Sequence, residues 1–256
     1  AAGAGWAARV FPDLPSAEQV PALWRAIAKL VRLDRPDPVA AWEEHLAALA
    51  RRRDFLNARR YTTLKYRGPG TDLSVGLPDG HVWVSGRSVS QHGISFAPNL
   101  PTEEVFTLPH CERVEGTVTS TKPLSYAGTL IDGFSMTFEE GCVVKATAAH
   151  GQAVLDDLLA TDPGASRLGE VALVPASSPI SASGLLFLNT LFDENAASHI
   201  ALGQAYKKCF DDGDSLGDAD FTARGGNSSL IHVDWMIGSD KVDVDGIGAG
   251  GAAEPL

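Results

Sequence analysis

Cysteine is scarce in this chain, and the scarcity excludes two kinds of site. The 256 residues include three cysteines, an odd number, and no two of them have the CxxC spacing. A disulfide framework needs paired cysteines, and a thiolate zinc site needs closely spaced ones. Cys111, Cys142 and Cys209 therefore support neither.

Long apolar runs and an excess of basic residues are also missing. No stretch approaches the roughly 18 to 20 apolar residues that a membrane span requires. Lys and Arg number 21 against 32 Asp and Glu, a formal net charge of −11. Because phosphates are bound by basic faces, this charge disfavours nucleic acid and membranes as partners. We expect a cytoplasmic globular protein, and because neither end resembles a natural terminus we expect a longer parent chain.

Several catalytic motifs are absent as well. The sequence contains no HExxH, no GxSxG and no GxxxxGK[ST]. These absences argue against a two-histidine zinc helix, a hydrolase nucleophile elbow and a nucleotide-phosphate loop. Arg224-Gly225-Gly226-Asn227 has the composition of an anion-binding nest, but a plain surface turn is the favoured interpretation.

The first sixty residues have a helical pattern. Ser16 and Gln19 have the spacing of a capping box. Asp37 followed by Pro38 is typical of a second helix start. Apolar residues recur at helical spacing after both positions. We therefore predict that residues 1–60 are a helical connector or the end of a preceding domain.

From about residue 61 the hydrophobic period changes to two, which predicts strands. Pro78-Asp79-Gly80 predicts a hairpin turn between strands at 73–75 and 82–84. The other expected elements are strands at 114–120, 134–138, 143–147, 170–174 and 230–237, and helices at 152–160 and 195–206. The predicted fold class is α+β, a mixed sheet with flanking helices.

A histidine and an aspartate lie unusually within one apolar strand. His232 and Asp234 alternate with apolar residues between Ser229 and Ile237, so their side chains project from the same face about 7 Å apart. Such a pair can converge on a metal ion. When this segment is considered alone, a His–Asp hydrogen bond on a solvated face is a better explanation than a metal site. Burying an aspartate there is costly unless a cation compensates, which keeps the metal hypothesis open.

The stretch from Leu191 to Tyr206 is the second unusual segment. We predict a helix with Asp193 as its cap, in which His199 and Tyr206 lie two turns apart on one face. Small residues between them would let this helix approach other backbone closely. Taken alone, each polar side chain is explained by a structural role in the core.

Three glutamates complete the set of candidates. Glu170 begins an apolar strand, and Glu103 and Glu104 lie in or beside a turn before Val105. A solvated position explains each one separately. Together with the two histidines and Asp234, glutamates make a mixed nitrogen and oxygen set suited to zinc, cobalt or manganese. Two such ions can share a carboxylate and hold a water between them.

Four blocks of the sequence resemble the thermophilic metallo-aminopeptidase family, of the aminopeptidase T and aminopeptidase S type. The blocks are Asn99–Thr107 (NLPTEEVFT), Leu168–Val174 (LGEVALV), Leu191–Tyr206 and Ile231–Ser239 (IHVDWMIGS). The resemblance extends through nearly the whole chain. It implies that residues 61–256 are a metal-binding catalytic domain with a thermophilic metalloprotease-like fold, the catalytic portion of such an enzyme without its N-terminal α/β domain.

The resemblance also implies a site and an activity. It implies two divalent metal ions, a peptide substrate, a homodimer and an active-site role for Tyr206. The five implied metal ligands are Glu104, Glu170, His199, His232 and Asp234. Glu103 is a candidate for the general base. The sequence thus predicts a metal-dependent aminopeptidase that uses a bridging water; the alternatives are an inactive, metal-stabilised fragment and a related metallo-amidase.

Overall fold

Helices form the first part of the chain, as their sequence patterns predict. The computed structural model describes residues 3–256, beginning with α1 (Ala4–Val10), α2 (Ser16–Leu30) and α3 (Pro38–Arg59). The Asp37 side chain accepts a hydrogen bond from the Ala40 amide at 3.0 Å, so the predicted start of α3 is confirmed. The predicted capping box is wrong: Pro15 precedes α2, and Ser16 is already inside it.

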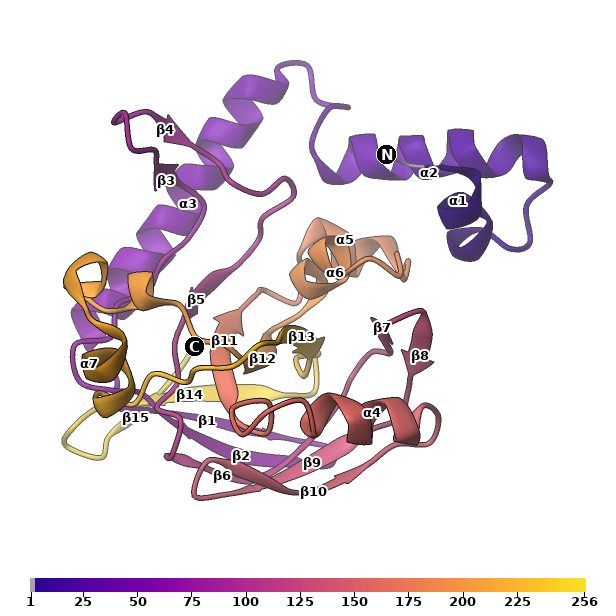
Figure 1. Ribbon diagram of the computed structural model, residues 1–256. Coiled ribbons are helices and arrows are strands. Elements are labelled where there is room, and N and C mark those ends of the chain that lie inside the picture. The colour runs from indigo at the N-terminus through magenta and orange to yellow at the C-terminus, as the bar shows by residue number, and fades with distance from the viewer. Residues whose placement is uncertain (1–2) are drawn as a thin grey trace.

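The larger of two main sheets is antiparallel throughout. Its strand order is β10-β9-β6-β2-β1-β14-β15 (Figure 1). The strands are β1 (Thr63–Gly68), β2 (Thr71–Gly76), β6 (Val114–Thr119), β9 (Ser135–Glu139), β10 (Cys142–Thr147), β14 (Asp243–Ile247) and β15 (Ala253–Pro255). The predicted strands near 114, 134 and 143 are therefore confirmed.

The hairpin predicted at Pro78-Asp79-Gly80 is wrong. The hairpin partner of β2 is β1, joined to it through Pro69 and Gly70, and the other edge of β2 pairs with β6. With both edges of β2 occupied, the chain after Gly80 crosses to other partners. Val82 donates its amide to the Cys209 carbonyl, and Val84 bridges to Phe106.

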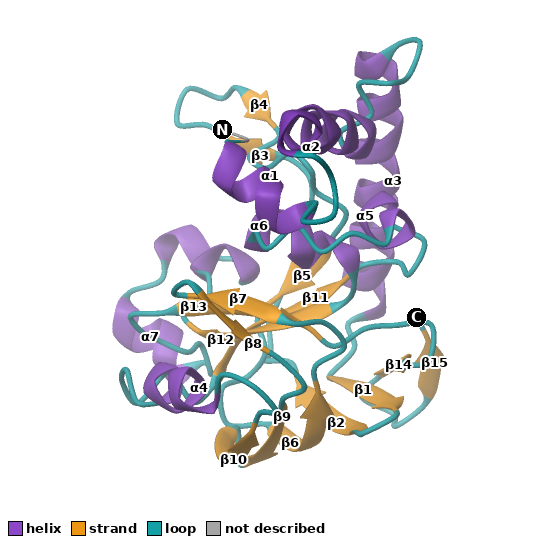
Figure 2. Ribbon diagram, turned by 90° about the vertical axis from the view of Figure 1, so that its right-hand side faces the viewer, coloured by secondary structure: helices purple, strands orange, loops and turns teal. Residues whose placement is uncertain are grey.

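The second main sheet has the order β13-β12-β11-β5 and is also antiparallel. Its strands are β5 (Val105–Thr107), β11 (Leu168–Leu173), β12 (His199–Gly203) and β13 (His232–Met236). Figure 2 shows this sheet stacked over the larger one. Alternate side chains of its three long strands enter the main core: Val171, Ile200, Leu202, Val233 and Trp235.

The helix predicted at 195–206 is wrong. A short helix α6 (Thr190–Asp193) and one 3-10 turn, η1 (Glu194–Ala196), are followed by the strand β12. Strand pairing on both edges of β12 outweighs the helix propensity of its alanine and leucine residues. Asp193 does not cap a following helix, because its carboxylate accepts hydrogen bonds from the Phe187 and Asn189 amides.

Shorter elements complete the fold. They are α4 (Gln152–Leu159), α5 (Pro179–Ser183), α7 (Asp218–Ala223), β3 (Ser88–Val89), β4 (Ser95–Phe96), β7 (Leu124–Tyr126), β8 (Thr129–Ile131), η2 (Lys207–Cys209) and η3 (Gly213–Ser215). Helices α1 and α2 pack with α5 and α6 in a small cluster that includes Leu23, Ile180 and Phe192. The α+β prediction is confirmed. None of the helices among residues 3–256 has the length and apolarity needed to cross a bilayer.

The glycine pair before β13 has a structural role. Asn227 is buried and donates its side-chain amide to the carbonyls of Gly164 (2.8 Å) and Gly203 (2.7 Å). A Cβ on Gly226 would lie 2.5 Å from the Phe221 ring. The segment 224–227 is therefore neither the surface turn favoured by its sequence nor an open anion nest.

Candidate metal centre

One face of the second sheet gathers four of the five predicted ligands. Residues directly opposite each other in antiparallel strands share a face, and residues two apart on a strand do too. Ala201 of β12 pairs with Glu170 on one side and with Asp234 on the other. His199 lies two residues before Ala201, and His232 lies two before Asp234. All four side chains therefore lie on the face opposite the core.

Small residues separate these side chains. Ala201 lies between Glu170 and Asp234, and Gly203 lies opposite His232. Gly203 has φ +98°, and a Cβ there would lie 2.2 Å from the Ile231 carbonyl oxygen. Ala201 thus leaves room between two proposed ligands, and Gly203 lets the chain before β13 approach β12 closely. The small residues were expected to let a helix approach other backbone, but they serve a strand instead.

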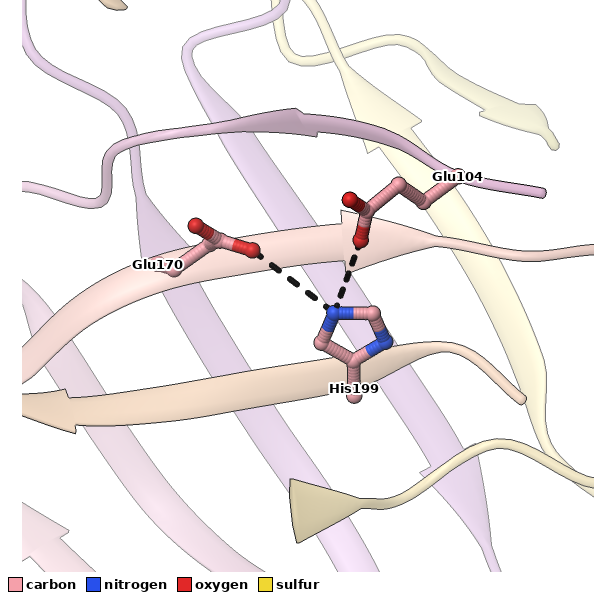
Figure 3. A group of neighbouring side chains, drawn as sticks. All are labelled: Glu104, Glu170 and His199. Atoms are coloured by element: carbon pink, nitrogen blue, oxygen red, sulfur yellow. Dashed lines mark ion pairs between the residues drawn. The ribbon is translucent and has the colours of Figure 1, made fainter. Parts of the chain in front are cut away.

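Glu104, the residue just before β5, contributes the fifth side chain on this face of the sheet. Its Oε2 lies 3.1 Å from Nε2 of His199, and Oε1 of Glu170 lies 3.6 Å from that nitrogen. Figure 3 shows both carboxylates converging on the imidazole. One ligand atom from each of these three buried residues lies within 4.8 Å of the other two.

A second group shares Glu170 with the first. Nε2 of His232 lies 3.7 Å from Oε2 of Glu170 and 3.4 Å from Oδ1 of Asp234. The ligand atoms of this group also lie within 4.8 Å of one another. Glu170 therefore has one carboxylate oxygen in each group, which is the arrangement that lets one carboxylate serve two cations.

Both imidazoles have their orientation fixed by backbone. Nδ1 of His199 lies 3.1 Å from the Ala197 carbonyl oxygen, and Nδ1 of His232 lies 2.7 Å from that of Gln204. A carbonyl only accepts, so each Nδ1 carries the proton and donates it. In the neutral ring, each Nε2 then presents a lone pair to the carboxylates. This is the tautomer and the type of support that metal-bound histidines have.

Two buried atoms of the cluster have no hydrogen bond within the described residues. They are Nε2 of His199 and Oδ1 of Asp234. An unsatisfied buried polar atom is costly, and lone pairs that face one another repel. A cation between these atoms would satisfy them, so the donor set fits a divalent metal.

The pKa values of the side chains in the cluster depart from their usual values. Burial alone would lower the pKa of His199, but the Glu104 and Glu170 carboxylates beside its Nε2 favour the protonated ring and raise that pKa well above its usual value. Burial raises the pKa of Glu170 to about 7, with the negative charges of Asp234 and Glu104 adding to the effect. Against the effect of burial, the neighbouring Asp234 carboxylate raises the pKa of His232 to about 9. A divalent cation bound by these side chains would therefore displace protons from them.

Glu103 does not join the cluster. Its carboxylate is buried and faces the helices, with Oε1 2.8 Å from Nη2 of Arg32 and Oε2 3.4 Å from Nε2 of His45. Adjacent residues in extended backbone point to opposite sides, which separates Glu103 from Glu104. The Glu103 carboxylate thus lies against Arg32 and His45 rather than in the cluster.

Tyr206 follows β12 rather than lying on a helix with His199. Its ring lies 4.7 Å from the His232 ring, centroid to centroid. Burial, followed by the nearby charges of Glu170 and Asp234, raises the pKa of Tyr206 to about 12. The phenol therefore keeps its proton near neutral pH and is able to donate it in a hydrogen bond.

A cavity of about 640 Å³ opens over both groups. Its lining includes Glu104, Glu170, His232, Asp234 and Tyr206. It also includes Glu194, which sequence reasoning missed. Burial raises the pKa of Glu194 to about 9, with the charges of Asp234 and Glu104 adding to the effect. An acidic residue between apolar Leu191-Phe192 and Ala196-Ala197 was the signal that could have identified it.

Two carboxylate–imidazole groups that share a glutamate beneath a cavity form a candidate metal centre in an α+β fold. Sequence comparison assigns the family. Residues 1–256 match the family described as Thermophilic metalloprotease (M29), and the chain belongs to that family. The family resemblance noted in the sequence is thereby confirmed.

Named relatives cover almost all of this chain. Aminopeptidase T of Thermus thermophilus is 55% identical over 252 residues, or 98% of this chain. Aminopeptidase AmpS of Bacillus subtilis is 48% identical over 256 residues, or 100% of it. The chain spans 61% and 62% of the lengths of these two relatives. The solved structure of wild-type AmpT from Thermus thermophilus matches with a TM-score of 0.92 and 53% identity, over 100% of this chain and 62% of that one.

Proposed function

We propose that this protein is a metal-dependent aminopeptidase whose five ligands hold two divalent cations, zinc, cobalt or manganese. The observation that carries the proposal is the shared Glu170, with a histidine Nε2 and a further carboxylate on each side of it. The names of the relatives supply the substrate class, an N-terminal residue of a peptide. When bound, the cations would activate a bridging water as nucleophile and polarise the scissile carbonyl.

In this proposal Tyr206 stabilises the charge that develops on the carbonyl oxygen. Its phenol stays protonated near neutral pH because its pKa is raised to about 12. The ring lies beside His232 and lines the cavity, so the hydroxyl is able to donate a hydrogen bond to an oxygen bound over the cluster. Donors aimed at a developing oxyanion contribute strongly to acyl-transfer catalysis.

Glu194 replaces Glu103 as our proposed proton acceptor. Burial and the neighbouring acids raise the pKa of Glu194, and bound cations would neutralise those acids. The carboxylate would then ionise at neutral pH. Glu194 lines the cavity and belongs to neither ligand group, so it is free to take a proton from the nucleophile and to return it to the leaving amine.

The proposal extends to organisation. We propose residues 61–256 as the metal-binding catalytic part and residues 1–60 as a helical connector that supports it through the contacts of Arg32 and His45 with Glu103. A cytoplasmic homodimer remains our expectation from the family resemblance. Analytical ultracentrifugation at several concentrations tests the dimer, and cell fractionation tests the location.

Metal removal with a matched pair of histidine variants tests the function. We expect a chelator to abolish release of N-terminal residues, and cobalt, zinc or manganese to restore it with two ions bound per chain. His199→Ala should lose both the activity and at least one ion, whereas His92→Ala, at an exposed position, should lose neither. Full activity in the metal-free protein contradicts the proposal.

Two further measurements separate the alternatives. One tightly bound ion without turnover supports the inactive, metal-stabilised fragment. Hydrolysis of acyl amides but not of peptides with a free α-amine supports the metallo-amidase.

A further inference from the structure

Lys208 is an unpaired ammonium in the lining of the metal-centre cavity. Among residues 3–256 no carboxylate lies within ion-pairing distance of it, although its neighbour Lys207 lies 2.6 Å from Asp218. Arg87 also lines the cavity, but its charge is paired with Glu43. Of the lysine and arginine side chains in the described lining of this cavity, Lys208 is therefore the one whose charge has no carboxylate partner.

Two aromatic rings hold this ammonium. Nζ of Lys208 lies 4.8 Å from the centre of the Phe106 ring and 5.1 Å from that of Tyr206. The two rings themselves meet edge to face, 6.5 Å apart. Cations are attracted to aromatic faces at such distances, so the charge is positioned without being neutralised.

The distance to the candidate metal ligands matches a very short peptide. The Tyr206 ring lies 4.7 Å from the His232 ring, so Nζ of Lys208 lies within about 10 Å of that imidazole. An extended chain advances by about 3.5 Å per residue. A peptide whose scissile carbonyl lies over the ligand groups would therefore bring its end to Lys208 after one or two residues.

We propose that Lys208 binds the C-terminal carboxylate of a dipeptide or tripeptide, so that a substrate with a free C-terminal carboxylate is bound more tightly than its amide. This inference rests on the proposed aminopeptidase function. A carboxylate is the charged group that such a peptide always carries beyond the bond to be cut. An acidic side chain on the residue after that bond has the same chemistry, so the two sources need separate substrates.

Three substrates and three variants, one of them a control, provide the kinetic test. The substrates are Leu-Ala, Leu-Ala amide and Leu-Asp amide. Lys208→Met should raise the KM of Leu-Ala about tenfold, the usual size of one charge-assisted hydrogen bond, and leave its kcat and both constants of Leu-Ala amide unchanged. Lys208→Arg should keep most of the preference for the free acid. Lys145→Met, an exposed lysine on β10, is the matched control and should change nothing.

Two results overturn the inference. If Lys208→Met raises the KM of Leu-Ala and of Leu-Ala amide equally, Lys208 acts through the Tyr206 ring and not on a carboxylate. If the KM of Lys208→Met rises for Leu-Asp amide alone, Lys208 binds an acidic side chain and not the C-terminus.

A binding experiment separates this inference from the proposed function. The metal-loaded protein is labelled by reductive ¹³C-methylation, which keeps lysine charged, and the Lys208 signal is assigned by its loss in Lys208→Arg. A reduced-bond analogue of Leu-Ala, which cannot be hydrolysed, should shift that signal, and the amide of this analogue should not. Equal shifts or no shift contradict the inference. Failure to hydrolyse any of the three peptides contradicts the aminopeptidase function instead.

Discussion

Nη2 of Arg32 lies 2.8 Å from Oε1 of Glu103, the residue next to the candidate ligand Glu104. Arg32 follows α2 and also lies over the Trp42 ring of α3 at 4.8 Å, so one guanidinium joins two helices to the approach of β5. The Glu103 amide in turn donates to Oδ1 of Asn195 at 2.6 Å. The ion pair thus fixes the backbone from which Glu104 enters the candidate metal centre.

Arg32→Met should strongly destabilise the fold. It leaves the buried Glu103 carboxylate without its cation, and breaking a buried pair from one side costs about 3–5 kcal/mol. Urea denaturation measures this free energy of unfolding. Arg32→Met with Glu103→Gln should recover much of the loss, because no buried charge remains. Arg35→Met, at an exposed position, is the control; a loss as large there would contradict the explanation.

Stability should fall in mild acid because of His45. Burial is the main cause that lowers the pKa of His45 to about 4, so the folded ring is neutral and its Nε2–H donates to the Thr102 carbonyl, 2.7 Å away. The ring in the unfolded chain has a pKa near its usual value of 6.5. The stabilisation is complete above pH 6.5 and is lost as the pH falls toward 4, because the unfolded state takes up the proton first.

The size of this effect is measured against a variant. Between pH 7 and pH 5, His45 should contribute about 2 kcal/mol to the loss of unfolding free energy. His45→Gln keeps a hydrogen-bond donor without a titrating group, so its loss over this interval should be smaller by that amount. Denaturant titrations at the two pH values give the comparison, and parallel curves for both proteins would contradict the prediction.

Tyr206→Phe should lower kcat about 100-fold, the usual size of one lost oxyanion donor. The metal content should not change, because the phenol belongs to neither ligand group. Peptide-release kinetics and elemental analysis of the same sample check both expectations. Tyr126→Phe, on β7, is the control. Loss of metal from Tyr206→Phe would show that the hydroxyl is a ligand instead.

Glu194→Gln should lower kcat with little change in KM or metal content. The amide has the shape of the carboxylate but cannot accept the proton, so the acidic limb of the pH–rate profile should also disappear. The exposed Glu112 offers a control substitution, Glu112→Gln. If the variant loses an ion, Glu194 is a metal ligand and another group must be the base.

Ala201→Leu should weaken metal binding without unfolding the sheet. Ala201 is fully buried between Glu170 and Asp234, and three added carbons there would push the two carboxylates apart. Overpacking of this kind costs about 1–3 kcal/mol of stability. Titration calorimetry should show at least a tenfold loss of metal affinity. Ile200→Val, on the core face of the same strand, should lose stability but keep its metal affinity.

The sequence predicted best those features that depend on one segment. The strand carrying His232 and Asp234 is β13, because its alternation of polar and apolar residues is complete within nine residues. The α+β class follows from the change of hydrophobic period near residue 61. The five proposed ligands gather in the structure; the strand alternation pointed to His232 and Asp234 as a pair, but the set of five came from the family resemblance.

Features decided by distant partners were predicted poorly. The segment 195–206 contains many helix-favouring residues, and pairing with β11 and β13 makes its centre a strand. Glu103 and Glu104 are identical in type, and the pairing of Val105 with Leu173 decides which of them faces the cluster. The turn at Pro78 lacked a hairpin partner because β6, more than thirty residues later, occupies the edge of β2.

The register of β12 has a consequence for how the protein reaches its folded state. A shift of this strand by one residue would turn His199 toward the core and Ile200 toward the cavity. A slipped chain would bury an imidazole in apolar surroundings and would also be unable to assemble either ligand group. A divalent cation present during synthesis would therefore stabilise the correctly paired sheet relative to misregistered ones. The ion would thus influence strand pairing during folding, before any substrate is bound.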